Sequence, residues 1–220
     1  MVRPSWKLSK CTECNIPHPL PPQLGRGWGG ATQLIMETKL ANPAPIGLMG
    51  FGMTTVLLNI HNAGFFPVSA VILAIGFFYG GIAQVIAGIL EFKKGNTFGM
   101  TAFVSYGMFW ISLVAIWLIP DMRTGKGIKT EEAFMGWFLF LWGLFSFFLW
   151  IGTFGKSRVL QFIFFTLWIL FFLLAIRDWT ESVLIGVIAG YEGIICGASA
   201  IYLAMAEMLL EARGKKILPF

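Results

Sequence analysis

The residues that could do chemistry in this sequence stand inside long apolar runs. Thr54, Asn59 and His61 fall in one run near the start of the chain, and Glu192 falls in another near its end. A polar or ionisable side chain at membrane depth is costly and often marks a solute or proton pathway. Glu192 is therefore a candidate proton site, or else its helix starts late and leaves this carboxylate near the membrane surface. His61 is either a proton-sensitive residue or an interfacial one.

The sequence Asn42-Pro43-Ala44-Pro45 opens the first of these runs. Asparagine caps helix N-termini well, and proline is tolerated in the first turn because the N–H groups there have no partner within the helix. A capped, proline-initiated helix therefore accounts for the motif. The same free N–H groups attract anions, so a substrate-entrance motif is the functional alternative.

Metal and enzyme chemistry find little support in the sequence. Cys11, Cys14 and His18 supply three of the four ligands that a structural zinc site needs, and no fourth ligand stands nearby. Cys196 lies in an apolar run and is expected to pack there. The chain has no nucleophile-elbow, zinc-protease, phosphate-loop or dinucleotide-binding motif. We therefore expect no metal, no cofactor and no enzymatic activity.

The composition places these residues in a membrane. Hydrophobic residues make up 57% of the chain and charged residues 12%, against about 25% charged residues in a soluble domain. This balance excludes a disordered chain, a soluble enzyme and a nucleic-acid binder, although the net charge is +5. Six runs are long enough to cross the hydrocarbon core as helices. They are residues 45–66, 68–91, 98–119, 133–152, 159–176 and 183–210.

The loops between these runs predict the orientation. Six spans put both termini on one side of the membrane, and twelve of the sixteen lysines and arginines fall on that side. The positive-inside rule makes this side cytoplasmic, so we expect a multi-pass protein of the inner membrane with both termini in the cytoplasm. Residues 1–35 are rich in proline, glycine and scattered cations, which predicts a flexible extension. Residues 36–220 form the transmembrane domain.

Several motifs together resemble the acetate uptake transporter family. They are Asn42-Pro43-Ala44-Pro45-Ile46-Gly47-Leu48, Phe78-Tyr79-Gly80-Gly81-Ile82-Ala83-Gln84, Gly95-Asn96-Thr97-Phe98-Gly99, Ser105-Tyr106-Gly107 and Cys196-Gly197-Ala198-Ser199-Ala200. The resemblance covers residues 36–220, with Ile46 in place of the family's leucine. It implies an all-α integral membrane protein with six transmembrane helices per protomer. It also implies a homo-hexamer that is similar in architecture to bacterial urea channels.

The resemblance further implies which residues line the substrate path. The family's path is narrowed by a phenylalanine, a tyrosine and a leucine, and these match Phe51, Tyr106 and Leu167. Without the resemblance, packing in the core would account for all three. Further polar or wall positions of the path are expected at Thr54, Asn59, Gln84 and Ala200.

The function implied by the resemblance is proton-coupled uptake of acetate, with succinate as a second substrate. An apolar gate fits this function, since moving a bare carboxylate into a low-dielectric medium costs on the order of 20 kcal/mol in the idealised limit. Protonation of the substrate, or hydrogen bonds from the Tyr106 hydroxyl or from N–H groups near Pro45, would lower that cost. The alternatives are a passive channel for carboxylates or small neutral solutes, and a non-transporting membrane sensor or scaffold. The expected partners are acetate, succinate, protons, further copies of the chain and the lipid bilayer.

Overall fold

The structure, a computed structural model, describes residues 40–123 and 131–220, and over residues 119–123 it describes the backbone alone. The extension expected over residues 1–35 lies outside the described residues, together with Cys11, Cys14 and His18. Residues Leu40–Phe220 form one compact unit.

Helices make up all the regular secondary structure of the described residues. In chain order they are α1 (Ala44–Asn62), α2 (Ala70–Ile75), η1 (Gly76–Ala83), α3 (Gln84–Lys93), α4 (Thr97–Arg123), α5 (Glu132–Ile151), α6 (Arg158–Thr180) and α7 (Val183–Arg213). Because α2, η1 and α3 follow one another as a single span, six helices are long and apolar enough to cross a membrane. This confirms the six spans expected from the apolar runs, and their ends agree to within four residues.

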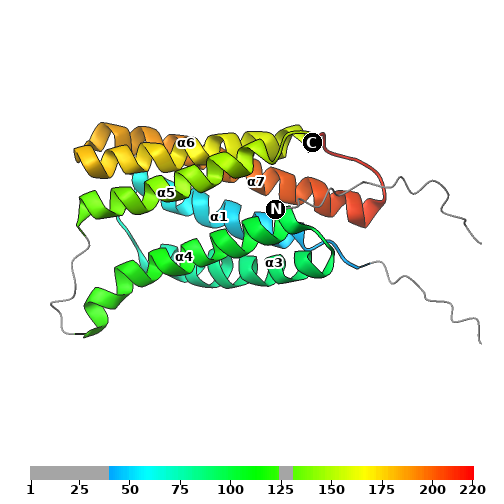
Figure 1. Ribbon diagram of the computed structural model, residues 1–220, viewed down its shortest axis with the longest axis horizontal. Helices are drawn as coiled ribbons and strands as arrows, with labels where there is room; N and C mark the ends of the chain where they lie inside the picture. Colours follow the sequence, from blue (N-terminus) through cyan, green and yellow to red (C-terminus); the bar gives the residue numbers. More distant parts are fainter. Residues whose placement is uncertain (1–39, 124–130) are drawn as a thin grey trace, which may run out of the picture. The chain divides into compact units, whose positions relative to one another are not determined.

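Successive spans run in opposite directions along the bundle (Figure 1). At one end α1, α4 and α6 begin, and α3, α5 and α7 finish; we call it the Lys94 end. At the other end α6 finishes and α7 begins, and we call it the Arg177 end.

Helices α1 and α7 approach each other closely because α7 has glycines, which carry no side chain, on the face that packs on α1. Gly190, Gly193 and Gly197 share one face of α7, which packs on α1. A Cβ added at Gly197 would lie 2.7 Å from the carbonyl oxygen of Gly52, and one at Gly190 would lie 2.6 Å from Cα of Ala63. Small residues let helices approach closely in lipid. The glycines of α7 therefore pack the inside of the protomer.

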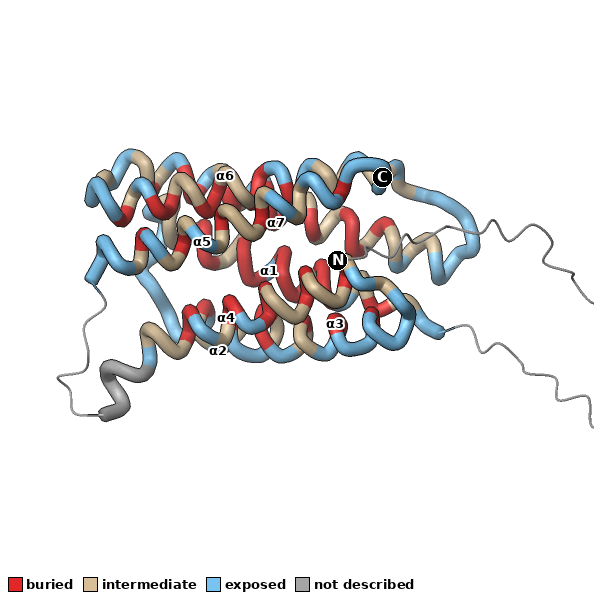
Figure 2. The backbone as a smooth tube through the Cα atoms, viewed as in Figure 1, coloured by how far each residue is buried: buried red, intermediate tan, exposed pale blue. Residues whose placement is uncertain are grey.

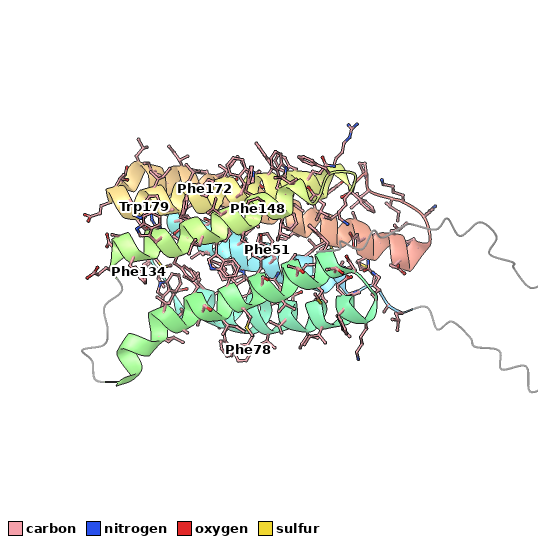
Figure 3. The ribbon with its side chains drawn as sticks, in the orientation of Figure 1. Phe51, Phe78, Phe134, Phe148, Phe172 and Trp179 are labelled. Carbon is pink, nitrogen blue, oxygen red and sulfur yellow. The ribbon has the colours of Figure 1, made fainter. Side chains whose placement is uncertain are left out.

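The outer surface of the bundle is apolar as well. Phe78, Phe134 and Phe148 are exposed by 65%, 73% and 68%, whereas Phe51 is exposed by only 7%. Figure 3 shows Phe51 in the middle of the bundle, with Phe78 and Phe134 at its edges. Figure 2 shows the buried positions on the helix faces that are turned inward. Exposed apolar surface on this scale is unusual for a soluble monomer and is expected of a multi-pass membrane protein.

The second span departs from the continuous α-helix that its apolar run suggested. Its middle, η1, is a π-helix, a form that often occurs at functional sites. Thr54 packs against this segment: its Oγ1 lies 3.5 Å from the Ile75 carbonyl oxygen, and a Cβ added at Gly80 would lie 2.8 Å from the same hydroxyl. Hydropathy could not reveal the π-helix, since the segment contains no proline and no polar group other than the Tyr79 hydroxyl.

Candidate transport pathway

Two cavities lie inside the bundle, and three side chains separate them. The first cavity has a volume of about 280 Å³ and reaches from the middle of the bundle to the Lys94 end. The second has a volume of about 30 Å³ and lies between α1, α4 and α6 on the other side of these side chains. Phe51, Tyr106 and Leu167 line both cavities. The structure thus brings together the three residues expected at the constriction, and we call them the ring.

The ring is closed in this structure. Phe51 comes from α1, Tyr106 from α4 and Leu167 from α6, and they are exposed by 7%, 3% and 2%. The centroids of the Phe51 and Tyr106 aromatic groups are 6.0 Å apart, which is within contact range for aromatic pairs. A solute passing between the two cavities would therefore have to displace apolar side chains.

The Tyr106 hydroxyl is already engaged away from the cavities. Its oxygen lies 2.8 Å from Oγ of Ser146, and that Oγ donates to the Trp142 carbonyl oxygen at 2.7 Å. A serine hydroxyl has one hydrogen to donate, so the Tyr106 O–H donates to Ser146. In this structure the hydroxyl that was expected to hydrogen-bond a substrate anion thus has Ser146 as its acceptor.

Polar groups reach the first cavity at two levels. Near the ring, Gln84 is exposed by only 1%, and its Oε1 has no hydrogen-bond partner among the described residues. At the Lys94 end the wall includes Lys156, Ser157 and Glu207. The Lys156 ammonium lies 4.9 Å from the centroid of Phe98, another wall residue. The first cavity thus has one amide near the ring and charges of both signs where it opens.

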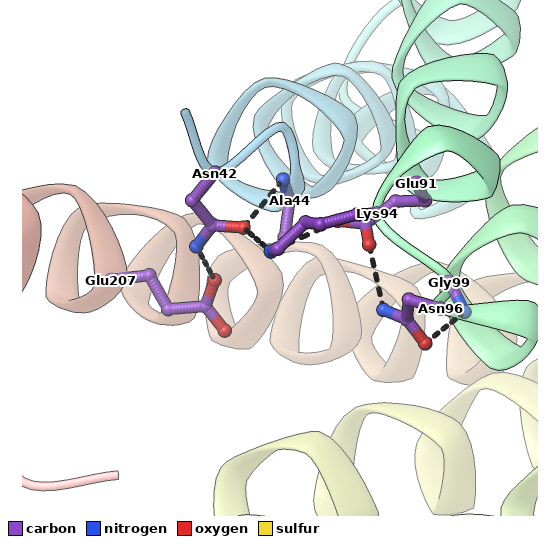
Figure 4. A network of polar contacts seen from close by, with 7 residues as sticks. All are labelled: Asn42, Ala44, Glu91, Lys94, Asn96, Gly99 and Glu207. Atoms are coloured by element: carbon purple, nitrogen blue, oxygen red, sulfur yellow. Dashed lines mark hydrogen bonds and ion pairs between the residues drawn. The ribbon is translucent and has the colours of Figure 1, made fainter. Parts of the chain in front are cut away.

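Asn42 joins three helices at the Lys94 end (Figure 4). Its Nδ2 donates to Glu207 Oε2 at 3.0 Å, and its Oδ1 accepts from Lys94 Nζ at 2.7 Å and from the Ala44 backbone N–H at 3.3 Å. Asn42 was expected at the N-cap position of α1, but it lies one residue before that position. In the structure Pro43 occupies the N-cap position and Pro45 lies in the first turn. Of the entrance motif, only Ala44 lines the first cavity.

A second part of the same network involves a carboxylate that sequence reasoning did not single out as a site. Glu91 is fully buried; its Oε2 accepts from Asn96 Nδ2 at 2.7 Å and its Oε1 lies 3.9 Å from Lys94 Nζ. Asn96 Oδ1 in turn accepts from the Gly99 backbone N–H at 3.1 Å. The sequence does contain a sign of this network: Glu91 stands at the end of a span and is followed closely by Lys94 and Asn96. Together these bonds tie the turn between α3 and α4 to the cavity wall.

The second cavity has an almost entirely apolar surface, although two polar residues of α1 are among those that line it. Thr55 and Asn59 are exposed by 2% and 1%, and both line this cavity. Asn59 Nδ2 donates to the Thr55 carbonyl oxygen at 2.9 Å, and Asn59 Oδ1 accepts from Asn62 Nδ2 at 3.0 Å. A third cavity, about 630 Å³ in volume, opens at the Arg177 end and is lined by Arg177 and Asp178 among others. Arg177 Nη1 donates to Asn62 Oδ1 at 3.3 Å.

Four expected site residues lie elsewhere. Thr54 and Ala200 are fully buried but line none of these three cavities. Thr54 faces η1, whereas its neighbour Thr55 lines the second cavity. Both carboxylate oxygens of Glu192 are inaccessible and have no hydrogen-bond partner among the described residues, and Glu192 lines none of the cavities. His61 Nδ1 lies 2.8 Å from the Phe66 carbonyl oxygen, in the turn after α1.

Known proteins share this sequence and this fold. The family model described as the GPR1/FUN34/yaaH family matches residues 29–215. The succinate-acetate/proton symporter SatP of Escherichia coli strain K12 is 58% identical over 183 residues, which are 83% of this chain and 96% of that protein. Acetate permease A of Emericella nidulans is 40% identical over 139 residues, which are 55% of this chain and 45% of that protein.

A solved structure described as that of the bacterial acetate channel SatP superposes on this one with a TM-score of 0.80. It is 58% identical and covers 83% of this chain and 99% of its own. All three relatives are named as a symporter, a permease or a channel. This agrees with the expectation of a transporter rather than an enzyme.

Proposed function

The chain belongs to the GPR1/FUN34/yaaH family, and we propose that it carries acetate across the membrane through its own six-helix bundle. The observation that carries this proposal is the pair of cavities that meet at the ring of Phe51, Tyr106 and Leu167. A path that narrows to three apolar side chains suits a solute with a small apolar body and one polar group. The names of the relatives supply acetate as that solute.

We further propose that acetate crosses the ring as the neutral acid. A carboxylic acid with a pKa near that of glutamic acid, about 4.3, is protonated in roughly one molecule in 500 at pH 7, which corresponds to about 4 kcal/mol. Taking the bare anion between apolar side chains costs several kcal/mol in real proteins and on the order of 20 in the idealised limit. Protonation is therefore the less costly route. Each acetate then carries one proton, without a titrating side chain in the path.

This mechanism gives proton-coupled uptake, the function also named for the bacterial symporter. We propose succinate as a second, slower substrate, since two carboxylates must then pass the ring. In an alternative mechanism a side chain would carry the proton, and the candidate is Glu192, because its carboxylate lies within α7 without a partner among the described residues. The second candidate function is a passive anion channel, which the description of the solved relative favours.

Purified protein in liposomes separates these mechanisms. Labelled acetate uptake is measured under an imposed pH gradient and, separately, under a potassium diffusion potential set with valinomycin; uptake by protein-free liposomes is subtracted. We expect the pH gradient to drive accumulation and the potential to have no effect, because an acetate–proton pair is neutral. Uptake driven by an inside-positive potential would identify an anion channel. Unchanged gradient-driven uptake in the Glu192→Gln variant would show that this carboxylate is not the proton site.

We also propose the assembly and the orientation. The chain forms a homo-hexamer of the urea-channel type in the inner membrane, each protomer has its own path, and both termini lie in the cytoplasm. The Lys94 end then faces the cytoplasm, in accordance with the lysines and arginines of its loops. The mass of the detergent-solubilised protein, and labelling of single cysteines at each end in intact cells, test these two points.

A further inference from the structure

A groove on the outer surface of the bundle lies between α6 and α7, apart from the three cavities. Its volume is about 530 Å³, and its walls are almost entirely apolar. It is lined by Arg158, Val159 and Phe162 of α6 and by Ile195, Ala198, Ser199 and Tyr202 of α7. The four residues of α7 share one face of that helix, since neighbours on a face are three or four positions apart. Because Ala198 and Ser199 are small, they leave a hollow between the larger side chains.

The two hydroxyl groups at the groove already have hydrogen-bond partners. Ser199 Oγ donates to the carbonyl oxygen of Ile195 at 2.8 Å, within α7. The Tyr202 hydroxyl donates to the Pro219 carbonyl oxygen at 2.8 Å, in the C-terminal segment that turns back from the end of α7 (Figure 1). Neither hydroxyl therefore needs a partner in the groove, and an occupant would contact mainly hydrocarbon there.

Arg158 is the charged residue of the groove. It is the first residue of α6 and is exposed, so it stands at the Lys94 end, where the membrane-spanning segment begins. Among the described residues, the Arg158 guanidinium has no hydrogen-bond or ion-pair partner. A guanidinium binds phosphate and carboxylate groups through paired hydrogen bonds. Arg158 therefore offers a site for an anionic group at one end of an apolar groove.

The direction of the groove fits an acyl chain. On α7 the groove extends from Ile195 to Tyr202, which is about 10 Å at 1.5 Å per residue. Because α7 finishes at the Lys94 end, Ile195 lies closer to the middle of the membrane than Tyr202 does. An occupant that satisfies both parts has an anionic group at the membrane surface and a hydrocarbon chain directed inward. An anionic phospholipid has this form.

A second copy of the chain matches Arg158 less well. Glu131, Glu132 and Glu181 are three of the four acidic residues that are exposed among the described side chains. All three lie at the Arg177 end, since they flank the start of α5 and the end of α6. A copy in the same orientation would place them on the other side of the membrane from Arg158. Anionic lipids, in contrast, attract basic residues at the membrane surface itself.

We propose that this groove binds an anionic phospholipid from the leaflet at the Lys94 end. Its phosphate binds Arg158, and one of its acyl chains lies along Phe162, Ile195 and Ala198. The site is on the outer surface of the bundle, so this inference does not depend on the proposed transport function.

Native mass spectrometry of the full chain in detergent tests this inference. The protein is titrated with phosphatidylglycerol and, separately, with phosphatidylcholine of the same acyl chains. The readout is the phosphatidylcholine concentration at which half of the protein retains a lipid, divided by the corresponding concentration of phosphatidylglycerol. We expect a ratio of about five or more for the unmodified protein, since one basic residue near an anionic membrane surface contributes about that factor. Arg158→Gln should bring the ratio close to one.

Matched variants separate the groove from the rest of the surface. Arg213→Gln removes the same charge at the end of α7, outside the groove, and should leave the ratio unchanged. Ala198→Phe fills the groove from an exposed position, so it should weaken retention of both lipids. Ala212→Phe, at an exposed position of α7 outside the groove, should not.

Four results would overturn the inference. Equal retention of the two lipids by the unmodified protein would exclude a preference for the anionic lipid. An equal fall of the ratio in Arg213→Gln would assign that preference to the charge of the whole surface. Unchanged retention in an Ala198→Phe protein that elutes like the unmodified protein would place the lipid outside the groove. Loss of oligomer mass in Ala198→Phe, without a change in lipid retention, would show that a second copy occupies the groove.

Discussion

Leu167 offers a direct way to separate a path residue from a core residue. It is exposed by only 2% and lines both cavities at the ring, whereas Leu203 of α7 is exposed by 1% and lines neither. Leu→Ala in the core of a soluble protein costs about 2–5 kcal/mol. Lipid tails are as apolar as leucine, so the transfer part of this cost is small here. We expect about 2 kcal/mol for either variant, measured by tryptophan fluorescence during denaturation in detergent.

Only Leu167→Ala should change what the protein carries. The substitution shortens one of the three side chains that separate the cavities of about 280 and 30 Å³, so larger acids gain passage. One methylene in an apolar pocket is worth about 10–200-fold in discrimination. We therefore expect benzoate uptake to rise at least tenfold relative to acetate uptake in liposomes. An unchanged benzoate-to-acetate ratio, or the same change in Leu203→Ala, would refute the placement of Leu167 at the constriction.

Three further predictions follow from the same geometry. Gly193→Ala should destabilise the bundle by about 1–3 kcal/mol or more, because the new Cβ would lie 2.5 Å from Asn59 Oδ1. At Gly76 the nearest atom to a new Cβ would lie at 3.0 Å, so Gly76→Ala should cost less stability in the same denaturation assay. Tyr106→Phe should retain most acetate uptake and lose about 0.5–1.5 kcal/mol of stability, since its hydroxyl donates to Ser146 and not into the path; loss of uptake with the fold intact would contradict this. Uptake at low acetate concentration should rise about tenfold from pH 7 to pH 6. The reason is that, well above a pKa of about 4.3, the neutral fraction of the acid grows tenfold for each unit that the pH falls. Uptake that does not change with pH, after subtraction of the protein-free leak, would exclude passage as the acid.

Hydropathy predicted which segments form the membrane-spanning helices, but it did not predict which face of each helix lines the cavities. Apolar runs predicted six helices because the bilayer imposes a length and a composition on each one. Thr54 and Thr55 are neighbours in one run, yet one packs on η1 and the other lines the second cavity. Successive residues of a helix point about 100° apart, and the mean hydropathy of a run does not show which of its faces lines a cavity. The three residues of the ring were expected at the constriction from the family resemblance. The sequence alone could not place them there, since packing in the core would explain all three equally well.

Hydrogen-bond direction could not be predicted from sequence either. Tyr106 donates to Ser146, which lies 40 positions away, and Arg177 reaches Asn62 across 115 positions. Such pairs depend on which helices are neighbours, and six similar spans allow many arrangements. The close approach of α7 to α1 through Gly193 has the same cause. Its glycine spacing predicts a close contact but does not identify the partner helix.

Reversible blockage at the ring tests the central claim most directly. Leu167→Cys, in a chain with Cys11→Ser and Cys14→Ser, is modified with a methanethiosulfonate and then reduced, with acetate uptake followed in liposomes and modification followed by mass spectrometry. Cys196 is buried, so it stays in place, and the parent chain without the Leu167 change serves as the control. We predict that modification abolishes uptake, that reduction restores it and that acetate slows the modification. Complete modification at position 167 with undiminished uptake would show that acetate does not pass between Phe51, Tyr106 and Leu167.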